Sequence, residues 1–116
     1  MKKIVLIACA LFLGTVHAQN EKAMKLNAGI ITEKLAETKT FYTKTIGFRV
    51  TFENDFYLLL HTPNKSAELS FLLPNHPTQK PIFQTPFAGK GVYITMEVED
   101  VDQIYEQLKA EGISFE

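Results

Sequence analysis

The chain has 116 residues, a length that corresponds to a single domain. Hydrophobic residues make up 46% of it and charged residues 22%, which is the balance of a globular protein and excludes a disordered or collagen-like chain. The formal net charge is −1, and no segment is rich in lysine or arginine. Because proteins that bind nucleic acids usually carry a basic patch, we expect no nucleic acid among the partners.

The N-terminus has the organisation of a cleavable signal peptide. A basic start, Lys2 and Lys3, precedes an almost unbroken hydrophobic run over residues 4–13, which is too short to span a membrane with ease. Small residues at the positions that a signal peptidase reads follow in residues 16–18. We expect a signal peptide over residues 1–18, a polar linker over residues 19–25, and a mature protein that is periplasmic or secreted and has no membrane partner.

Removal of this leader changes both the charge and the cysteine content. Cys9 is the only cysteine, so the mature chain has neither a disulfide nor a thiol nucleophile. Loss of Lys2 and Lys3 leaves ten basic and thirteen acidic residues, a net charge of −3. Residues 6–9 resemble a lipoprotein cleavage box, and lipid attachment at Cys9 is the alternative to simple export.

Hydrophobic periodicity predicts an α+β domain over residues 26–116. Hydrophobic residues at helical spacing predict one helix over residues 35–46, ended by Gly47, and a second that is capped by Asp100 and ended by Gly112. Residues 74–90 hold four of the five prolines and predict a long loop. Short or alternating hydrophobic runs predict six strands, at residues 26–32, 48–53, 56–61, 67–73, 92–98 and 113–116.

The order of these elements is strand, helix and three strands, followed by strand, helix and strand. It corresponds to two βαβββ modules, the second of which lacks two strands. We therefore expect the domain to be C-terminally incomplete, as part of a longer natural chain.

Strand alternation predicts one hydrophobic and one polar face of the sheet. The hydrophobic side, which includes Phe48, Val50 and Phe52 on the second strand, is expected to pack against the helices. Glu68 on the polar side stands between hydrophobic neighbours, where burial is costly without a partner or ligand, and it is the candidate catalytic base. Either this face is simply solvated, or it forms a part-polar ligand pocket lined by Asn27, Glu68, Ser70, Tyr93, Thr95 and Glu97.

Two other groups of residues are weaker candidates. A metal site made of His61, Glu68 and His76 is conceivable, but no short ligand spacing supports it. Phe83 and Phe87 lie in the predicted loop, where they would cover the pocket as a lid, fill a dimer contact or pack into the core.

Three segments carry a family resemblance. The first is Leu35, then Phe41-Tyr42, then Gly47-Phe48, which resembles the "FY…LGF" signature of the glyoxalase, bleomycin resistance protein and dioxygenase superfamily, also called the vicinal oxygen chelate superfamily. Residues 97–102, followed by a helix and Gly112, resemble the second module of that superfamily. Residues 87–91 resemble its bleomycin-resistance branch. The resemblance covers residues 26–116 and implies paired βαβββ modules that form an open, U-shaped sheet around a ligand cavity.

The resemblance also implies a set of metal-ligand positions, most of which have changed here. Metal-dependent members place His or Glu on the first strand, Glu on the fourth, His on the fifth and Glu on the last. By spacing, the first three positions correspond to Asn27, Glu68 and Tyr93, and the fourth lies beyond Glu116. Asn27 and Tyr93 are poor ligands at neutral pH, so we expect no tightly bound metal and no other cofactor.

These observations lead to three hypotheses. The first is an exported small-molecule-binding protein, or glyoxalase-like enzyme, that holds no metal tightly. The second is a metal-dependent lyase, similar to lactoylglutathione lyase, or a dioxygenase with an altered ligand set. The third is a non-catalytic structural dimer module. Members of this fold usually dimerise, and the shortened second module leaves a sheet edge unpaired, so we expect a homodimer.

Overall fold

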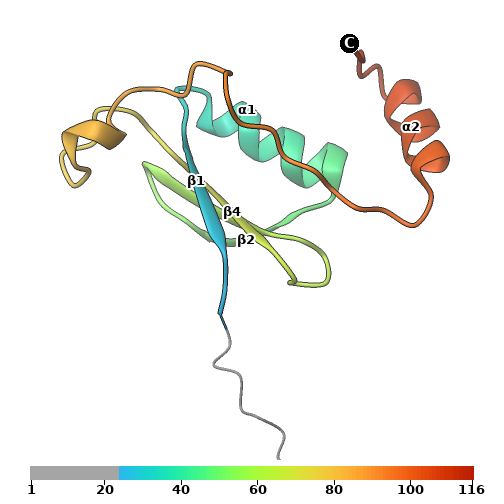
Figure 1. Cartoon of the computed structure of the whole chain (residues 1–116), viewed down its shortest axis with the longest axis horizontal. Helices are drawn as coiled ribbons and strands as arrows, with labels where there is room; N and C mark the ends of the chain where they lie inside the picture. The colour runs from blue at the N-terminus through green and yellow to red at the C-terminus, as the bar shows by residue number, and fades with distance from the viewer. Residues whose placement is uncertain (1–23) are drawn as a thin grey trace, which may run out of the picture.

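The computed structural model describes residues 24–116 of the chain (Figure 1). The predicted signal peptide, the lipoprotein alternative at Cys9 and most of the linker lie outside the described residues. Among residues 24–116, no helix has the length and hydrophobicity needed to cross a membrane.

A four-stranded sheet forms the centre of the molecule and confirms the first four predicted strands. Its order is β1-β4-β3-β2, with β1 parallel to β4 and the other neighbours antiparallel. The parallel pair is made possible by the helical crossover that follows β1, as βαβ connections require. The strands are β1 (Asn27–Ile31), β2 (Arg49–Glu53), β3 (Tyr57–His61) and β4 (Glu68–Leu72).

One continuous helical segment covers one face of this sheet (Figure 1). It begins as the α-helix α1 (Leu35–Thr40) and continues as the wider π-helix η1 (Phe41–Ile46). Gly47 ends it with a φ of 90°, a left-handed conformation that glycine adopts without steric cost, as the sequence predicted.

The hydrophobic core lies between this helical segment and the sheet. Leu60 is fully buried and Leu58 nearly so, and the Tyr42 ring contacts the rings of Phe48 and Phe71 at centroid distances of 5.4 and 5.1 Å. Each large buried side chain of this kind contributes about 1.5–3 kcal/mol to folding. The buried core residues are Phe48, Leu58, Leu60, Leu69 and Phe71, and Ile30, Leu35, Tyr42 and Ile46 pack against them.

The predicted alternation of the second strand is wrong at its end. A β-bulge lies between Val50 and Phe52, because Val50 pairs with Leu60 while Phe52 pairs with its neighbour Leu59. Leu60 belongs to the core and Leu59 faces the other way, so Phe52 leaves the core side of the sheet and is 52% exposed. A period-two pattern cannot reveal an inserted residue, and the bulge therefore exchanges the faces of the residues after it.

The fifth and sixth predicted strands are absent from the structure. Residues 92–98 form neither helix nor strand and make no backbone hydrogen bond to the sheet, and residues 113–116 form no strand either. A strand needs a neighbouring edge, and the outer edge of β1 is met only where the Phe87 N–H donates to the Ile31 carbonyl. Within residues 24–116 neither segment pairs with the outer edge of β1 or with that of β2.

Helix α2 (Val101–Ala110) forms as predicted, although within residues 24–116 it contacts mainly the segment that follows it, through Tyr105 and Phe115. The Asp100 carboxylate accepts a hydrogen bond from the Gln103 N–H at 2.9 Å and caps the first turn. The helix stands to one side of the sheet and packs on none of its strands (Figure 1). Three of its hydrophobic residues are consequently exposed: Val101 at 68%, Ile104 at 38% and Tyr105 at 42%.

Alkaline pH should test the packing of Tyr42. Burial raises the pKa of Tyr42 above its ordinary value of 10.0, so the folded state keeps the phenolic proton at a pH where the unfolded state has lost it. The stabilisation is complete below that ordinary value and is lost as the pH rises through the folded-state pKa. We expect the free energy of unfolding from urea titrations to fall above pH 10, and Tyr42→Phe to reduce that fall. Tyr105→Phe, which removes an exposed hydroxyl, is the control, and an equal effect there would contradict the assignment.

Candidate ligand-binding face

The face of the sheet that the helical segment leaves uncovered, here called the open face, carries the polar strand residues. Because side chains alternate along a strand, residues next to the core members of β3 and β4 point to this side. β4 contributes Glu68 and Ser70 to the open face, and β1 contributes Asn27, which lies opposite Glu68 in the parallel register. The structure therefore brings together three of the six predicted pocket residues.

Ser70 ties β1 to β4 through its side chain. Its hydroxyl donates to Asn27 Oδ1 at 3.1 Å and lies 3.3 Å from the Ala28 carbonyl. Gly29, the register partner of Ser70, makes this possible, since a Cβ at that position would lie only 3.3 Å from Ser70 Oγ and 3.7 Å from Leu72 Cδ1. The serine, only 4% exposed, thus has its hydrogen-bonding needs met within the sheet.

Glu68 has a charged partner that the sequence analysis did not identify. Its carboxylate accepts a hydrogen bond from the Lys25 ammonium group and forms an ion pair with it. The Glu68 side chain is only 10% exposed, whereas that of Lys25 is 59% exposed. A buried carboxylate needs a partner or ligand to offset its loss of hydration, and here Lys25 of the same chain is that partner. Lys25 is two residues before Asn27, so strand alternation could have placed it on the same face.

Two further residues extend this polar group across the sheet. His61 on β3 lies opposite Glu68, and Arg49 on β2 lies opposite His61. The His61 Nδ1 atom shares a hydrogen bond of 2.7 Å with the Thr51 hydroxyl. The alternation of β3, in which Leu58 and Leu60 are buried, would have assigned His61 to the open face. We call the line Asn27, Glu68, His61 and Arg49 the polar row.

The remaining predicted pocket residues lie outside the sheet. Tyr93, Thr95 and Glu97 belong to the segment over residues 92–98, and Tyr93 is 89% exposed. No backbone hydrogen bond within the described chain holds this segment beside the polar row.

The donor atoms on the open face do not suit a divalent cation. The Asn27 oxygen accepts from Ser70, the Glu68 carboxylate is neutralised by Lys25, and Tyr93 is an exposed residue outside the sheet. Among residues 24–116, no three His, Cys, Asp or Glu side chains gather as a metal-binding group would.

The alternative set of His61, Glu68 and His76 is not assembled either. The His76 ring stacks on Phe56 with a centroid distance of 3.6 Å, and its Nδ1 atom contacts the Thr78 hydroxyl at 2.8 Å. His61 and Glu68 are neighbours on the open face, but His76 is engaged in the loop that follows β4.

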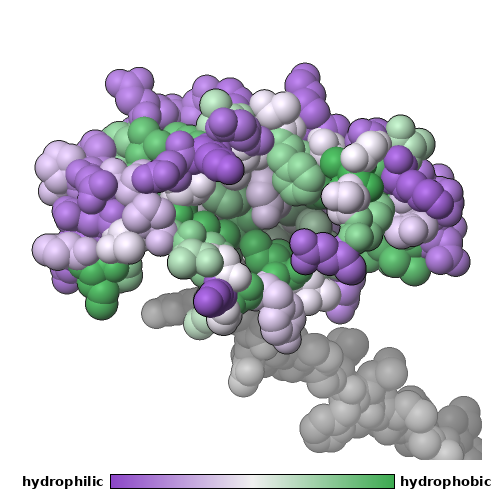
Figure 2. Space-filling view, turned by 90° about the horizontal axis from the view of Figure 1, so that it is seen from above, coloured by the Kyte–Doolittle hydropathy of each residue, from purple (hydrophilic) through white to green (hydrophobic). Residues whose placement is uncertain are grey.

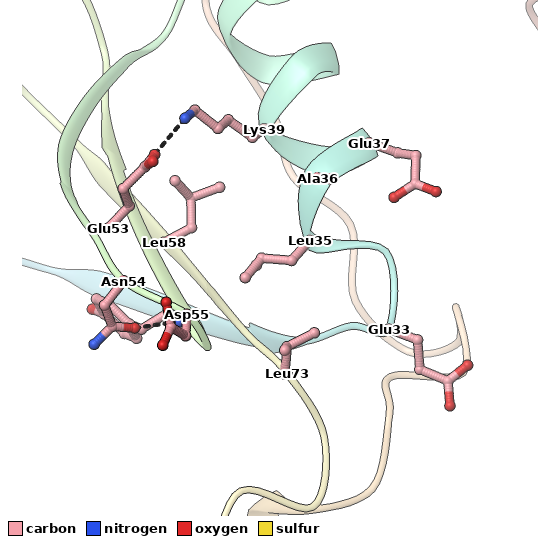
Figure 3. Close-up of a pocket in the computed structure, with 11 residues that line it drawn as sticks. Glu33, Leu35, Ala36, Glu37, Lys39, Glu53, Asn54, Asp55, Leu58 and Leu73 are labelled. Carbon is pink, nitrogen blue, oxygen red and sulfur yellow. Dashed lines mark hydrogen bonds and ion pairs between the residues drawn. The ribbon is translucent and has the colours of Figure 1, made fainter.

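A cavity of about 470 Å³ opens elsewhere, between the start of α1 and the β2–β3 turn (Figure 3). Its floor is hydrophobic and includes Leu35, Leu58 and Leu73. Glu33 and Glu37 at its rim point away from this floor in Figure 3, and Lys39 pairs with Glu53. Binding sites usually present polar groups that converge on a ligand, so this cavity is a weaker candidate than the open face.

Phe87 lies on the core side of the sheet rather than over the polar row. It lines a second cavity, of about 330 Å³, together with Ile30, Tyr42 and Phe71. Phe83 is in the short 3₁₀ helix η2 (Pro81–Phe83) and is 52% exposed. The two residues were expected to form a lid, a dimer contact or part of the core. The position of Phe87 beside Ile30, Tyr42 and Phe71 favours packing against the core.

Comparisons with known proteins agree with this architecture. The family model described as "Glyoxalase/Bleomycin resistance protein/Dioxygenase superfamily" matches residues 23–116. A comparison with curated proteins finds no match.

Solved structures that resemble the chain share its fold at low sequence identity. A glyoxalase/bleomycin resistance protein/dioxygenase from Nocardioides is 20% identical with a TM-score of 0.63, and the match covers 84% of this chain and 68% of that one. A superfamily member from Sphaerobacter thermophilus is 24% identical with a TM-score of 0.61, covering 80% and 74%. A bleomycin resistance determinant encoded on the transposon Tn5 is 19% identical with a TM-score of 0.55, covering 81% and 69%.

A double-mutant cycle tests the contact between Lys25 and Glu68. We expect Lys25→Met and Glu68→Gln to show a coupling free energy of about 0.5–1 kcal/mol in urea unfolding, because one partner is nearly buried while the other is exposed. The same cycle on Lys39 and Glu53, whose side chains are 43% and 47% exposed, should give a smaller value. A coupling no larger than that of the exposed pair would show that Lys25 does not compensate Glu68.

Proposed function

We propose that this chain, which belongs to the glyoxalase, bleomycin resistance protein and dioxygenase superfamily, binds a small organic molecule on its open face without a tightly bound metal. The observation that supports the proposal most is the polar row, in which hydrogen-bonding and charged groups from all four strands share one line of the sheet. Polar groups that are already fixed by neighbours, such as Asn27 by Ser70, are preorganised for a ligand.

The charge of Glu68 supports the metal-independent form of this proposal. In a metal site the carboxylate would be a ligand of the cation, whereas here an ammonium group from the same chain is its partner. Glu68 is also the only carboxylate in the polar row, so it is the candidate to accept a proton from a bound molecule.

We further propose that the protein works in the periplasm or outside the cell. The support is the N-terminal sequence alone, with its basic start, hydrophobic run and small residues before position 19.

A second copy of the chain is the partner that we propose for α2. The helix carries Val101, Ile104 and Tyr105 on one side, all of them exposed, and the neighbouring residues Ile94, Met96 and Val98 are about half exposed. Figure 2 shows hydrophobic side chains at the surface toward the end of the molecule where α2 lies. Exposed hydrophobic side chains that gather in one region of the surface are typical of a protein–protein contact.

Thermal denaturation with a library of metabolites and metal salts tests ligand binding. We expect organic compounds to raise the melting temperature of the wild-type protein by a few degrees and to do so less for Glu68→Gln, because the variant alters the polar row. Glu99→Gln, which removes an exposed carboxylate outside the sheet, is the control.

The possible results separate the three hypotheses. Stoichiometric nickel, zinc or iron in the purified protein that is lost in Glu68→Ala would contradict the proposal and indicate a metal-dependent lyase or dioxygenase. A library without a single stabilising compound would contradict it in favour of a structural dimer module.

Light scattering tests the dimer. We expect a mass of twice the monomer at micromolar concentration, and we expect Ile104→Glu to shift the mass toward the monomer because it places a charge in the contact. Gln103→Glu adds the same charge on α2 outside the hydrophobic side and should leave the dimer intact. A monomeric wild-type protein, or equal effects of the two variants, would overturn the assignment.

A further inference from the structure

We propose that the ligand of the open face is a small amphipathic anion, whose carboxylate or phosphate group binds beside Arg49 and His61. This inference rests on the proposed function and specifies the chemical class of its ligand. It comes from three features of the open face: the balance of charge along the polar row, the fixed position of the histidine, and the hydrophobic side chains that continue from it.

The charge balance favours an anion at the β2 end of the polar row. Lys25 neutralises Glu68, which leaves Arg49 as the remaining formal charge of the row. Within residues 24–116, the ion pairs are Lys25–Glu68 and Lys39–Glu53, so Arg49 has no carboxylate partner there. A guanidinium group offers a planar pair of donors that matches a carboxylate or a phosphate.

His61 provides a second, oriented group at the same place. Because Nδ1 is engaged with the Thr51 hydroxyl, Nε2 is the ring nitrogen that remains for another partner. Arg49 and His61 are paired across β2 and β3, so one oxyanion can contact both side chains. A single guanidinium and one imidazole suit one anionic group, whereas polyanions such as nucleic acids require many cations.

The hydrophobic part of the ligand would lie along the neighbouring positions of β2 and β3. Leu59 and Tyr57 precede His61 at alternate positions of β3, so they lie on the same open face, and both are partly exposed. The β-bulge adds Phe52 to the same side, with its ring 6.2 Å from that of Tyr57. Strand geometry places Tyr57 about 13 Å from His61, four residues along β3. An anion with a hydrophobic body about 10 Å long can therefore contact Arg49 and the two aromatic rings together.

Matched probes test both halves of this inference. We would titrate the full-length protein with 4-phenylbutyrate, with its neutral analogue 4-phenylbutyramide, with butyrate and with phenethyl phosphate, using calorimetry or NMR. We expect the two aromatic anions to bind at least about ten-fold more tightly than the amide or butyrate, because the first lacks the charge and the second lacks the ring. The comparison of the carboxylate with the phosphate shows which oxyanion the site prefers.

Charge-removing variants identify the group responsible. Arg49→Gln should weaken binding of 4-phenylbutyrate by about ten-fold or more and leave the amide unchanged. Lys44→Gln removes the same charge from an exposed position on η1 and should have no effect. Phe52→Ser should weaken the aromatic anions and not butyrate.

Two results would overturn the inference, and they differ in what they say of the proposed function. Equal affinity for the carboxylate and the amide would show a small-molecule site that does not select anions. The proposed function would then hold, and the anion inference would be wrong. Failure of all four probes to bind would contradict the anion assignment, and the metabolite library would then decide separately whether the open face binds any small molecule.

Discussion

The parallel pairing of β1 with β4 is the constraint on which the rest of the molecule depends. It places Asn27 opposite Glu68 and allows Ser70 to reach across to Asn27, although 43 residues separate the two hydrogen-bonded side chains in the chain. A parallel pair needs a crossover, and α1 and η1 provide it while covering one face of the sheet. The contacts of Tyr42 with Phe48 and Phe71 hold that crossover in place, so the packing of one face fixes the arrangement of polar groups on the other.

Local sequence signals predicted most of the first module, because they report interactions between near neighbours. The alternation that places Glu68 and Ser70 on one face of β4, the glycine that ends η1 and the aspartate that caps α2 each act within a few residues, and each appears as predicted. The signals failed over residues 92–98, where the pattern indicates a face that could be buried in a sheet. A strand forms only where an edge accepts its hydrogen bonds, and the sequence of the segment does not contain that information.

The same reasoning explains which site residues could be found. Asn27, Glu68 and Ser70 were predicted because strand alternation places them on one face, and their register confirms that they are neighbours. Lys25 was missed because it lies before the strand begins, in a segment that composition assigned to the linker. His61 was considered only as a metal ligand, although its place at the end of β3 makes it a neighbour of Glu68 in the polar row.

The bulge in β2 decides the chemical character of the open face. With unbroken alternation, Phe52 would lie on the core side and Glu53 would stand on the open face opposite Tyr57, where the hydrophobic part of the ligand is proposed to lie. The inserted residue reverses both positions: Glu53 pairs with Lys39 on α1, and Phe52 joins Tyr57 on the open face. The Thr51 hydroxyl, at the bulge itself, holds the His61 ring. One extra residue thus replaces an acidic group beside Tyr57 with an aromatic ring, so that a hydrophobic surface continues from Arg49 and His61, which is the combination that a hydrophobic anion requires.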